Sequence, residues 1–291
     1  MSGQLYLLPC PISEAPALDA LPASTVETAR RIDHFLVEAA RTARATLKAM
    51  GHPKPIAELD IVEIGHDPAP ELISEWLQPV LDGANAAVLS ESGCPGVADP
   101  GAQIAARAHE LGIRVVPLTG PSSILLTLMA SGLDGQRFRF SGYLPKHDAE
   151  RRAAILAAEK ASRASETQLF IETPYRNTAL LDALLETLAP DTRLTVAIDV
   201  TGQNESIRTL TAAAWKAIPK AMRTLPKLPT VFAFLAKPGN RAPRYAPECA
   251  GGKRAHTAPS SKPAVLNNRP KQAFKTHRPE GSPVKTLKGG R

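Results

Sequence analysis

Three carboxylates and one arginine follow predicted strand ends, where side chains can carry out proton transfer or bind phosphate. Glu14 follows the first apolar run of the chain, Glu38 the second and Glu91 the fourth. Each carboxylate suits a general base acting on a hydroxyl, and each also suits a solvated turn or helix start. Arg41 lies on one predicted helix face with Arg44, where it suits either a phosphate contact or a solvated surface. Glu14, Glu38 and Arg41 are our candidate catalytic residues.

The segment 90–101, Ser-Glu-Ser-Gly-Cys-Pro-Gly-Val-Ala-Asp-Pro-Gly, is the strongest candidate for a ligand-binding loop. Its three glycines and two prolines favour a fixed, sharply turned backbone between an apolar run and a helix. Open α/β sheets bind ligands at such loops, which lie at the carboxyl ends of parallel strands. A second interpretation stays open, in which Asp99 caps the next helix and Pro100 is its first residue.

Several other chemistries lack support in the sequence. Cys10, Cys94 and Cys249 are widely spaced and form no zinc pattern, and the seven histidines form no HExxH motif, so no metal site is predicted. Neither a Walker-type phosphate loop nor GxGxxG occurs. Because no histidine is near Cys94 in sequence, we interpret it as a small loop residue rather than a nucleophile.

Short apolar runs alternate with helical stretches through the first 118 residues. The pattern predicts strands at 4–8, 34–37, 60–64, 86–90 and 114–118, and helices at 41–50, 71–81 and 103–111. Strands that alternate with helices favour a mostly parallel sheet with helices on its faces.

A turn-rich segment at 117–121 predicts a hinge between two domains. Beyond it we expect helices at 122–130, 149–162 and 177–188, and strands at 137–142, 168–171, 193–198, 206–210 and 230–235. These strands are more closely spaced, which favours a mixed sheet. The sequence therefore predicts α/β domains at 1–118 and 119–238.

The net charge of +7 arises from the last part of the chain. Residues 239–291 contain twelve Lys and Arg residues but only two acids, a net of +10, which leaves −3 for residues 1–238. Rich in Pro, Gly and Ser, this segment is predicted to be a disordered basic tail. It suits salt-sensitive contacts with RNA phosphates or a solubilising extension.

Hydropathy favours a cytoplasmic protein. Hydrophobic residues make up 43% of the chain, as in globular enzymes. No apolar run approaches the roughly 20 residues of a membrane span, and the N-terminus lacks a signal-peptide pattern. We expect no membrane partner.

Six segments match known sequence motifs in the same order along the chain. The loop 90–101 is similar to S-D-A-G-T-P-x-x-x-D-P-G. The other segments are 5–12, similar to the P-T-P-I-G-N turn, 37–42 to A-E-D-T-R-H, 112–121 to G-I-R-V-V-P-L-P-G-P, 137–152 to G-F-L-P-x-K and 169–176 to L-I-F-Y-E-S-x-H-R. Through these motifs the chain resembles the tetrapyrrole methylase superfamily, and specifically its branch that methylates a ribose 2′-hydroxyl in bacterial small-subunit ribosomal RNA.

The resemblance implies a two-domain fold that binds S-adenosylmethionine in a cleft between the domains. It also implies a homodimer and RNA or a ribosomal subunit as partner. Carried onto this chain, the cofactor-binding residues are Pro9, Ser92, Gly93, Cys94, Val97, Ser122, Ser123, Glu172 and Thr230.

The chain departs from the family pattern on the substrate side. Ser13 and Glu14 stand where glycine and asparagine are expected, and Ala39 replaces an acidic residue. Two alternatives to an RNA methyltransferase therefore stay open. One is a methyltransferase for a small molecule such as a tetrapyrrole, and the other is an RNA-associated homologue without catalytic activity.

Overall fold

Two five-stranded sheets organise residues 2–14 and 16–237, which are the residues that the computed structural model describes. These residues fall within one unit of the chain, Met1–Ala242. The predicted tail at 239–291 lies outside the described residues. None of the helices in this part of the chain has the length and apolar character that a bilayer crossing requires.

The first sheet is entirely parallel, with strand order β3-β2-β4-β1-β5. Its elements are β1 (Gln4–Leu8), α1 (Ala17–Ala20), α2 (Ala23–Ala29), β2 (His34–Val37), α3 (Ala40–Ala49), η1 (Ile56–Glu58), β3 (Asp60–Glu63), α4 (Pro70–Trp76), α5 (Gln78–Leu81), β4 (Ala86–Leu89), α6 (Gly101–Glu110) and β5 (Arg114–Pro117). The predicted parallel sheet is confirmed.

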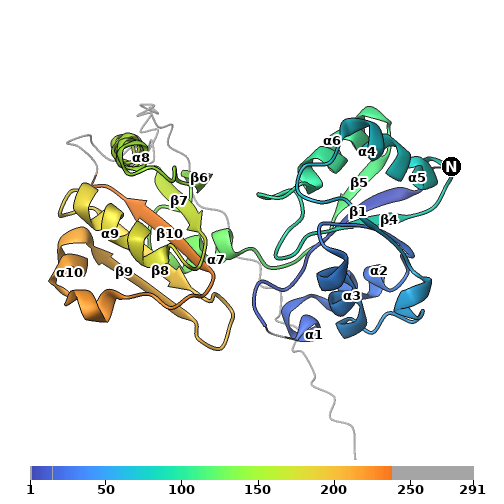
Figure 1. The fold of residues 1–291 in the computed structure, drawn as a ribbon, viewed down its shortest axis with the longest axis horizontal. Coiled ribbons are helices and arrows are strands. Elements are labelled where there is room, and N and C mark those ends of the chain that lie inside the picture. Colours follow the sequence, from blue (N-terminus) through green and yellow to red (C-terminus); the bar gives the residue numbers. More distant parts are fainter. Residues whose placement is uncertain (1, 15, 238–291) are drawn as a thin grey trace, which may run out of the picture. The chain divides into compact units, whose positions relative to one another are not determined.

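Helices cover both faces of this sheet, as Figure 1 shows. Successive side chains of a strand point to opposite faces. Phe35 of β2 accordingly packs in one cluster with Leu47 of α3, whereas Leu36 packs in another with Ile104 of α6. All four side chains are fully buried, and each such burial contributes about 1.5–3 kcal/mol to folding.

The second sheet is mixed, with strand order β6-β7-β10-β8-β9, as predicted. Only β6 and β7 are parallel, and the other neighbours are antiparallel. Its elements are α7 (Ser123–Ser131), β6 (Phe138–Tyr143), α8 (Asp148–Ser162), β7 (Thr167–Glu172), α9 (Asn177–Thr187), β8 (Arg193–Ile198), β9 (Ser206–Thr211), α10 (Ala212–Ala217), η2 (Lys220–Arg223) and β10 (Thr230–Leu235).

Successive side chains of β10 likewise point to opposite faces of the second sheet. Phe232 packs with Leu181 of α9 and Trp215 of α10, and Val231 packs with Ile124 of α7. In Figure 1, α8, α9 and α10 lie over one face of the sheet and α7 over the other.

The predicted helix at 71–81 is wrong, and several short helices were not predicted from the sequence. The helix expected at 71–81 is two helices, α4 and α5, because Pro79 has no N–H to continue the hydrogen-bond ladder. The short helices α1, α2 and α10 give too little periodicity to be recognised. The other predicted elements agree with the structure to within two residues at each end.

The loops that leave β1 and β4 meet beside each other. These strands are neighbours in the sheet, and their connections run to helices on opposite faces. Backbone hydrogen bonds in both directions join Cys10 of one loop to Gly93 of the other. Such a reversal in strand order is where open α/β sheets bind ligands.

Candidate active site

A cavity of about 360 Å³ gathers five of the nine predicted cofactor-binding residues. The loop after β4 contributes Ser92 and Val97, α7 contributes Ser123, and the second sheet contributes Glu172 and Thr230. This cavity, here called the cofactor cavity, falls within the range of small-molecule sites, which is roughly 300–1,000 Å³. Residues more than a hundred positions apart in sequence therefore line one cavity.

The other four predicted cofactor-binding residues do not line the cofactor cavity. Pro9 is buried, Gly93 pairs with the loop after β1, and Ser122 caps α7 by accepting from the Leu125 N–H at 3.4 Å. The Cys94 thiol donates to the carbonyl of Pro121 at 3.3 Å. In this structure these residues lie in the framework that supports the cavity.

Local hydrogen bonds hold the loop 90–101 in its shape. Gly93 and Gly96 have φ of +74° and +84°, a region that glycine adopts without steric cost. Oδ1 of Asp99 accepts from the N–H groups of Gly96 at 2.7 Å and Gly101 at 2.8 Å. Pro100 precedes the helix rather than starting it, so the predicted cap is displaced by one residue. Asp99 still satisfies the N–H of the first helical residue.

The cofactor cavity is acidic. Its described lining contains four carboxylates, Glu38, Glu91, Asp99 and Glu172, and no Lys, Arg or His. The same charges act on a buried thiol nearby: burial, then Asp99 and Glu38, raise the pKa of Cys10 to about 12. A negative lining favours a ligand that carries positive charge.

Glu38 and Glu91 are linked. Glu38 Oε2 accepts from the Glu91 N–H at 3.2 Å, and its Oε1 lies 2.8 Å from Nδ1 of His66. Both oxygens of Glu38 are therefore engaged. The exposed Glu91 carboxylate accepts from the Thr42 hydroxyl at 3.4 Å.

A second cavity, of about 590 Å³, shares Glu91 and Ser92 with the cofactor cavity. Its lining also includes Glu14 and the loop between β8 and β9. Ser13 joins the two sides, because its hydroxyl lies 3.2 Å from the Thr201 carbonyl and 3.1 Å from the Thr201 hydroxyl. We call this space the acceptor cavity.

The β8–β9 loop lines the acceptor cavity, which the sequence pattern did not predict. Asp199 and Thr201 adopt positive φ values of 48° and 68°, and Asp199 Oδ2 accepts from the Asn204 N–H at 2.9 Å. The polar run after the predicted strand at 193–198, which contains Gly202, was the available signal.

Glu172 is buried at the end of β7 and holds the second-sheet side of the cofactor cavity. Its Oε1 accepts from the Thr173 N–H at 2.7 Å, and its Oε2 lies 3.3 Å from the Arg176 guanidinium. Next to it, the Asn177 amide donates to the Thr230 hydroxyl at 2.9 Å. The two predicted contacts, Glu172 and Thr230, are register partners on the neighbouring strands β7 and β10.

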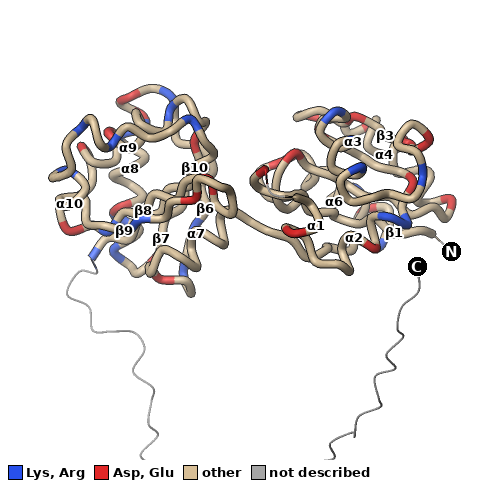
Figure 2. Tube along the Cα trace, turned by 90° about the horizontal axis from the view of Figure 1, so that it is seen from below, with Lys and Arg blue, Asp and Glu red and all other residues tan. Residues whose placement is uncertain are grey.

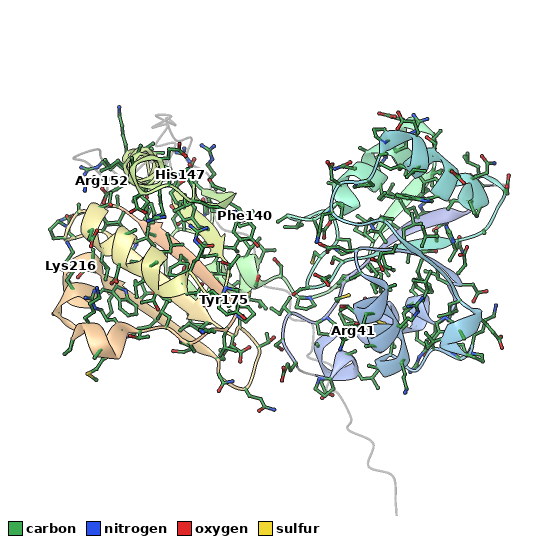
Figure 3. The ribbon with its side chains drawn as sticks, in the orientation of Figure 1. Arg41, Phe140, His147, Arg152, Tyr175 and Lys216 are labelled. Atoms are coloured by element: carbon green, nitrogen blue, oxygen red, sulfur yellow. The ribbon has the colours of Figure 1, made fainter. Side chains whose placement is uncertain are left out.

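Arg41 is a predicted catalytic residue that the structure does not bring into either cavity. It is exposed on α3 and lines neither the cofactor cavity nor the acceptor cavity. Figure 3 labels it among the helices of the first sheet. A phosphate contact beyond the cavities stays a prediction.

The chain is thus a two-sheet α/β protein. An acidic cavity lies where the strand order of its parallel sheet reverses, and residues of the mixed sheet complete the lining of that cavity. The chain belongs to the tetrapyrrole (corrin/porphyrin) methylase family, whose model matches residues 17–215.

Two similar proteins from different bacteria are both named ribosomal RNA small subunit methyltransferase I. The chain is 30% identical over 203 residues to ribosomal RNA small subunit methyltransferase I of Bacillus subtilis, covering 70% of this chain and 65% of the relative. It is 34% identical over 188 residues to the protein of that name from Escherichia coli O157:H7, covering 64% and 60%. The chain thus spans somewhat less than two thirds of these relatives' length.

Solved structures support the fold. Diphthine synthase aligns with a TM-score of 0.57 and 17% identity over 80% of this chain and 90% of that one. The methyltransferase CobJ aligns with a TM-score of 0.54 and 16% identity over 81% and 95%. The predicted two-sheet, tetrapyrrole-methylase-like fold is confirmed.

Cys94 is expected to be dispensable as a nucleophile. Burial, followed by the charge of Asp99, raises the pKa of its thiol, which lowers the thiolate fraction at neutral pH. We expect Cys94→Thr, whose hydroxyl can also donate to the Pro121 carbonyl, to change S-adenosylmethionine affinity less than about threefold, under 1 kcal/mol. Isothermal calorimetry measures this.

A thiol assay provides an independent check. In a Cys249→Ser background, a disulfide reagent at pH 8 should modify native Cys94 more slowly than a free thiol, and Cys10 should react only after unfolding. Fast modification of Cys94, or loss of methyl transfer in Cys94→Thr, would contradict the assignment.

Proposed function

We propose that this chain is an S-adenosylmethionine-dependent methyltransferase that acts on a ribose 2′-hydroxyl of small-subunit ribosomal RNA. The observation that carries the proposal is the convergence of Ser92, Val97, Ser123, Glu172 and Thr230 on one acidic cavity. The relatives named as ribosomal RNA methyltransferases support the substrate.

The lining of the cofactor cavity suits S-adenosylmethionine. Apolar side chains from Ile12, Ile171 and Val231 provide surface for an adenine ring. The four carboxylates favour a ligand with a sulfonium and an ammonium group. When bound, the cofactor supplies an electrophilic methyl group. The protein must then align the acceptor with that group and exclude water.

Of the three carboxylate candidates, Glu91 has the geometry that best suits a base. It lines both cavities, whereas Glu38 lines only the cofactor cavity and Glu14 only the acceptor side. Since the methyl group must pass from one cavity to the other, a base has to reach the hydroxyl where they join. We assign the base to Glu91, a positioning role to Glu38 and an acceptor contact to Glu14.

A homodimer is part of the proposal. Leu125 and Met129 of α7 are 49% and 78% exposed, and Phe138 of β6 is 42% exposed. Exposed apolar side chains of this size are typical of an interface. We expect a dimer at micromolar concentration in sedimentation equilibrium, and Met129→Glu should shift it toward monomer. A wild-type monomer under these conditions would contradict this part.

The remaining expectations complete the proposal. A ribosomal substrate places the reaction in the cytoplasm. Residues 1–118 and 119–238 are proposed as the two domains, with the cofactor between them, and the basic segment 239–291 as an aid to RNA binding.

Labelled methyl transfer tests the function directly. The full chain is incubated with tritiated S-adenosylmethionine and small ribosomal subunits from a strain that lacks it. We expect label in RNA, recovered after nuclease digestion as a 2′-O-methylated nucleoside. If calorimetry detected no binding of S-adenosylmethionine at millimolar concentration, the proposed methyltransferase function would be contradicted. Cofactor binding without transfer to RNA would favour the small-molecule or non-catalytic alternatives.

A further inference from the structure

Tyr175 is a highly exposed aromatic side chain next to the cofactor cavity. Its residue is 81% exposed, in the turn that leaves β7. The two residues before it, Thr173 and Pro174, line the cofactor cavity. Figure 3 labels the side chain. An aromatic ring at this place is available to a ligand that extends out of the cavity.

A cation already lies over this ring. The Lys227 ammonium is 5.1 Å from the centroid of the Tyr175 ring, within the distance of a cation–π contact. An aromatic face beside a positive charge is the combination that single-stranded nucleic acid recognises, since bases stack on rings and phosphates pair with cations.

Lys227 ends a segment that contains cationic but no acidic residues. Residues 206–227 contain five Lys and Arg residues and no Asp or Glu, whereas residues 1–238 as a whole carry −3. Hydrogen bonds hold the stretch around Lys227 against the start of α9: the Leu225 N–H donates to the Thr178 hydroxyl at 3.0 Å, and the Asn177 amide donates to the Leu228 carbonyl at 2.8 Å.

The basic segment extends away from the cavity. Lys220 lies 3.4 Å from Asp182 of α9, and Lys216 of α10 lies well away from Tyr175 in Figure 3. Figure 2 shows Lys and Arg in blue and Asp and Glu in red along the whole described chain. Cations spaced along one stretch of chain suit the successive phosphates of an extended strand.

Because both cavities are lined by carboxylates, an RNA backbone needs a cationic surface outside them. Glu14, Glu91 and Asp199 line the acceptor cavity, and its described lining has no Lys, Arg or His. A phosphate would be repelled there. An RNA substrate must therefore present a sugar to the cavity while its backbone is held outside, on cations.

We infer that Tyr175 is a stacking platform for a nucleobase adjacent to the target nucleotide, and that Lys227 and the other cations of the basic segment 206–227 contact the neighbouring RNA phosphates. The inference rests on the proposed function, because it specifies how that substrate is held. The ligand chemistry is single-stranded RNA rather than duplex, since stacking on a side chain requires an unpaired base.

Fluorescence anisotropy with a labelled single-stranded RNA of about 12 nucleotides tests the platform. With the full chain, Tyr175→Ala should weaken RNA binding about 5- to 100-fold, the range for losing one base–aromatic stack. Tyr175→Phe and Tyr175→Trp should stay within about twofold, because they keep the ring. S-adenosylmethionine affinity of all three should match the wild type.

Salt dependence separates the ring from the charge. Lys227→Ala should lower the slope of log Kd against log salt by about 0.7, the value for one phosphate contact on a single strand. Tyr175→Ala should leave that slope unchanged. Lys48→Ala, which removes an exposed charge of α3, serves as the matched control.

The outcomes distinguish the two proposals. Wild-type protein that neither binds nor methylates RNA would overturn the proposed function and the platform with it. Active wild type with an unaffected Tyr175→Ala would overturn the platform alone. Equal losses in Tyr175→Phe and Tyr175→Ala, or a reduced salt slope in Tyr175→Ala, would also overturn it, because stacking needs only the ring.

Discussion

Glu91→Gln is expected to lower kcat for methyl transfer by about 10²- to 10⁴-fold, the usual contribution of a positioned base. Glutamine has the size of glutamate and can still accept from the Thr42 hydroxyl, whose oxygen lies 3.4 Å from Glu91 Oε1. The fold of the loop and the affinity for S-adenosylmethionine should therefore change little. Single-turnover transfer of labelled methyl groups to small ribosomal subunits measures the effect.

Two matched variants sharpen this experiment. Glu75→Gln removes an exposed carboxylate of α4, which lines neither cavity, and should retain wild-type kcat. Glu38→Gln should cost less than Glu91→Gln, because we assign Glu38 to positioning the Glu91 N–H. If Glu38→Gln were the more damaging, the roles would have to be exchanged. A fully active Glu91→Gln would show that no base acts from this position.

Gly120→Ala is expected to impair both stability and cofactor binding. A Cβ at Gly120 would lie 2.2 Å from the Cβ of Pro9, a rigid ring that cannot rotate away. The clash forces apart the loop after β1 and the segment 117–121, which the Thr25 hydroxyl holds through the Thr119 carbonyl at 2.7 Å. Overpacking of this kind costs about 1–3 kcal/mol.

The same displacement should weaken S-adenosylmethionine binding at least about tenfold, or roughly 1.4 kcal/mol. The reason is that Ser123 follows the displaced segment and lines the cofactor cavity. Thermal denaturation and calorimetry provide the two measurements. Gly135→Ala is the control, since a Cβ there meets no atom within 4 Å. Equal thermal stability and equal S-adenosylmethionine affinity of Gly120→Ala and Gly135→Ala would show that Gly120 does not support the cofactor cavity.

The alternation of apolar and helical segments predicted both sheets, because side-chain periodicity reflects which face of an element is buried. It failed where elements are short or where one residue overrides the pattern. Pro79 is an example: the apolar periodicity at 71–81 continues past it, but the missing N–H divides the helix. The cap of α6 likewise lies one residue later than predicted, at Pro100 instead of Asp99, while the Asp99 carboxylate accepts from the N–H groups of Gly96 and Gly101.

The candidate site was only partly predictable. Motif resemblance predicted Ser92 and Thr230, which both line the cofactor cavity, but it could not separate them from Cys94, whose thiol donates to the Pro121 carbonyl instead. The β8–β9 loop was missed because its role depends on contact with Ser13, 188 positions away from Thr201. No local pattern reports contacts of that separation.

By itself the sequence determined the α/β class, the order of the strands and of the longer helices, the loop 90–101 and the family resemblance, since all of these depend on local residue types and spacing. Only the tertiary structure decided which residues of that loop line a cavity and which support it. It also showed that Glu91 stands where two cavities join, and that Tyr175 and Lys227 meet beside the site. The physical reason is that a side chain's surroundings are set by how distant strands pack, and the loop sequence alone does not specify that packing.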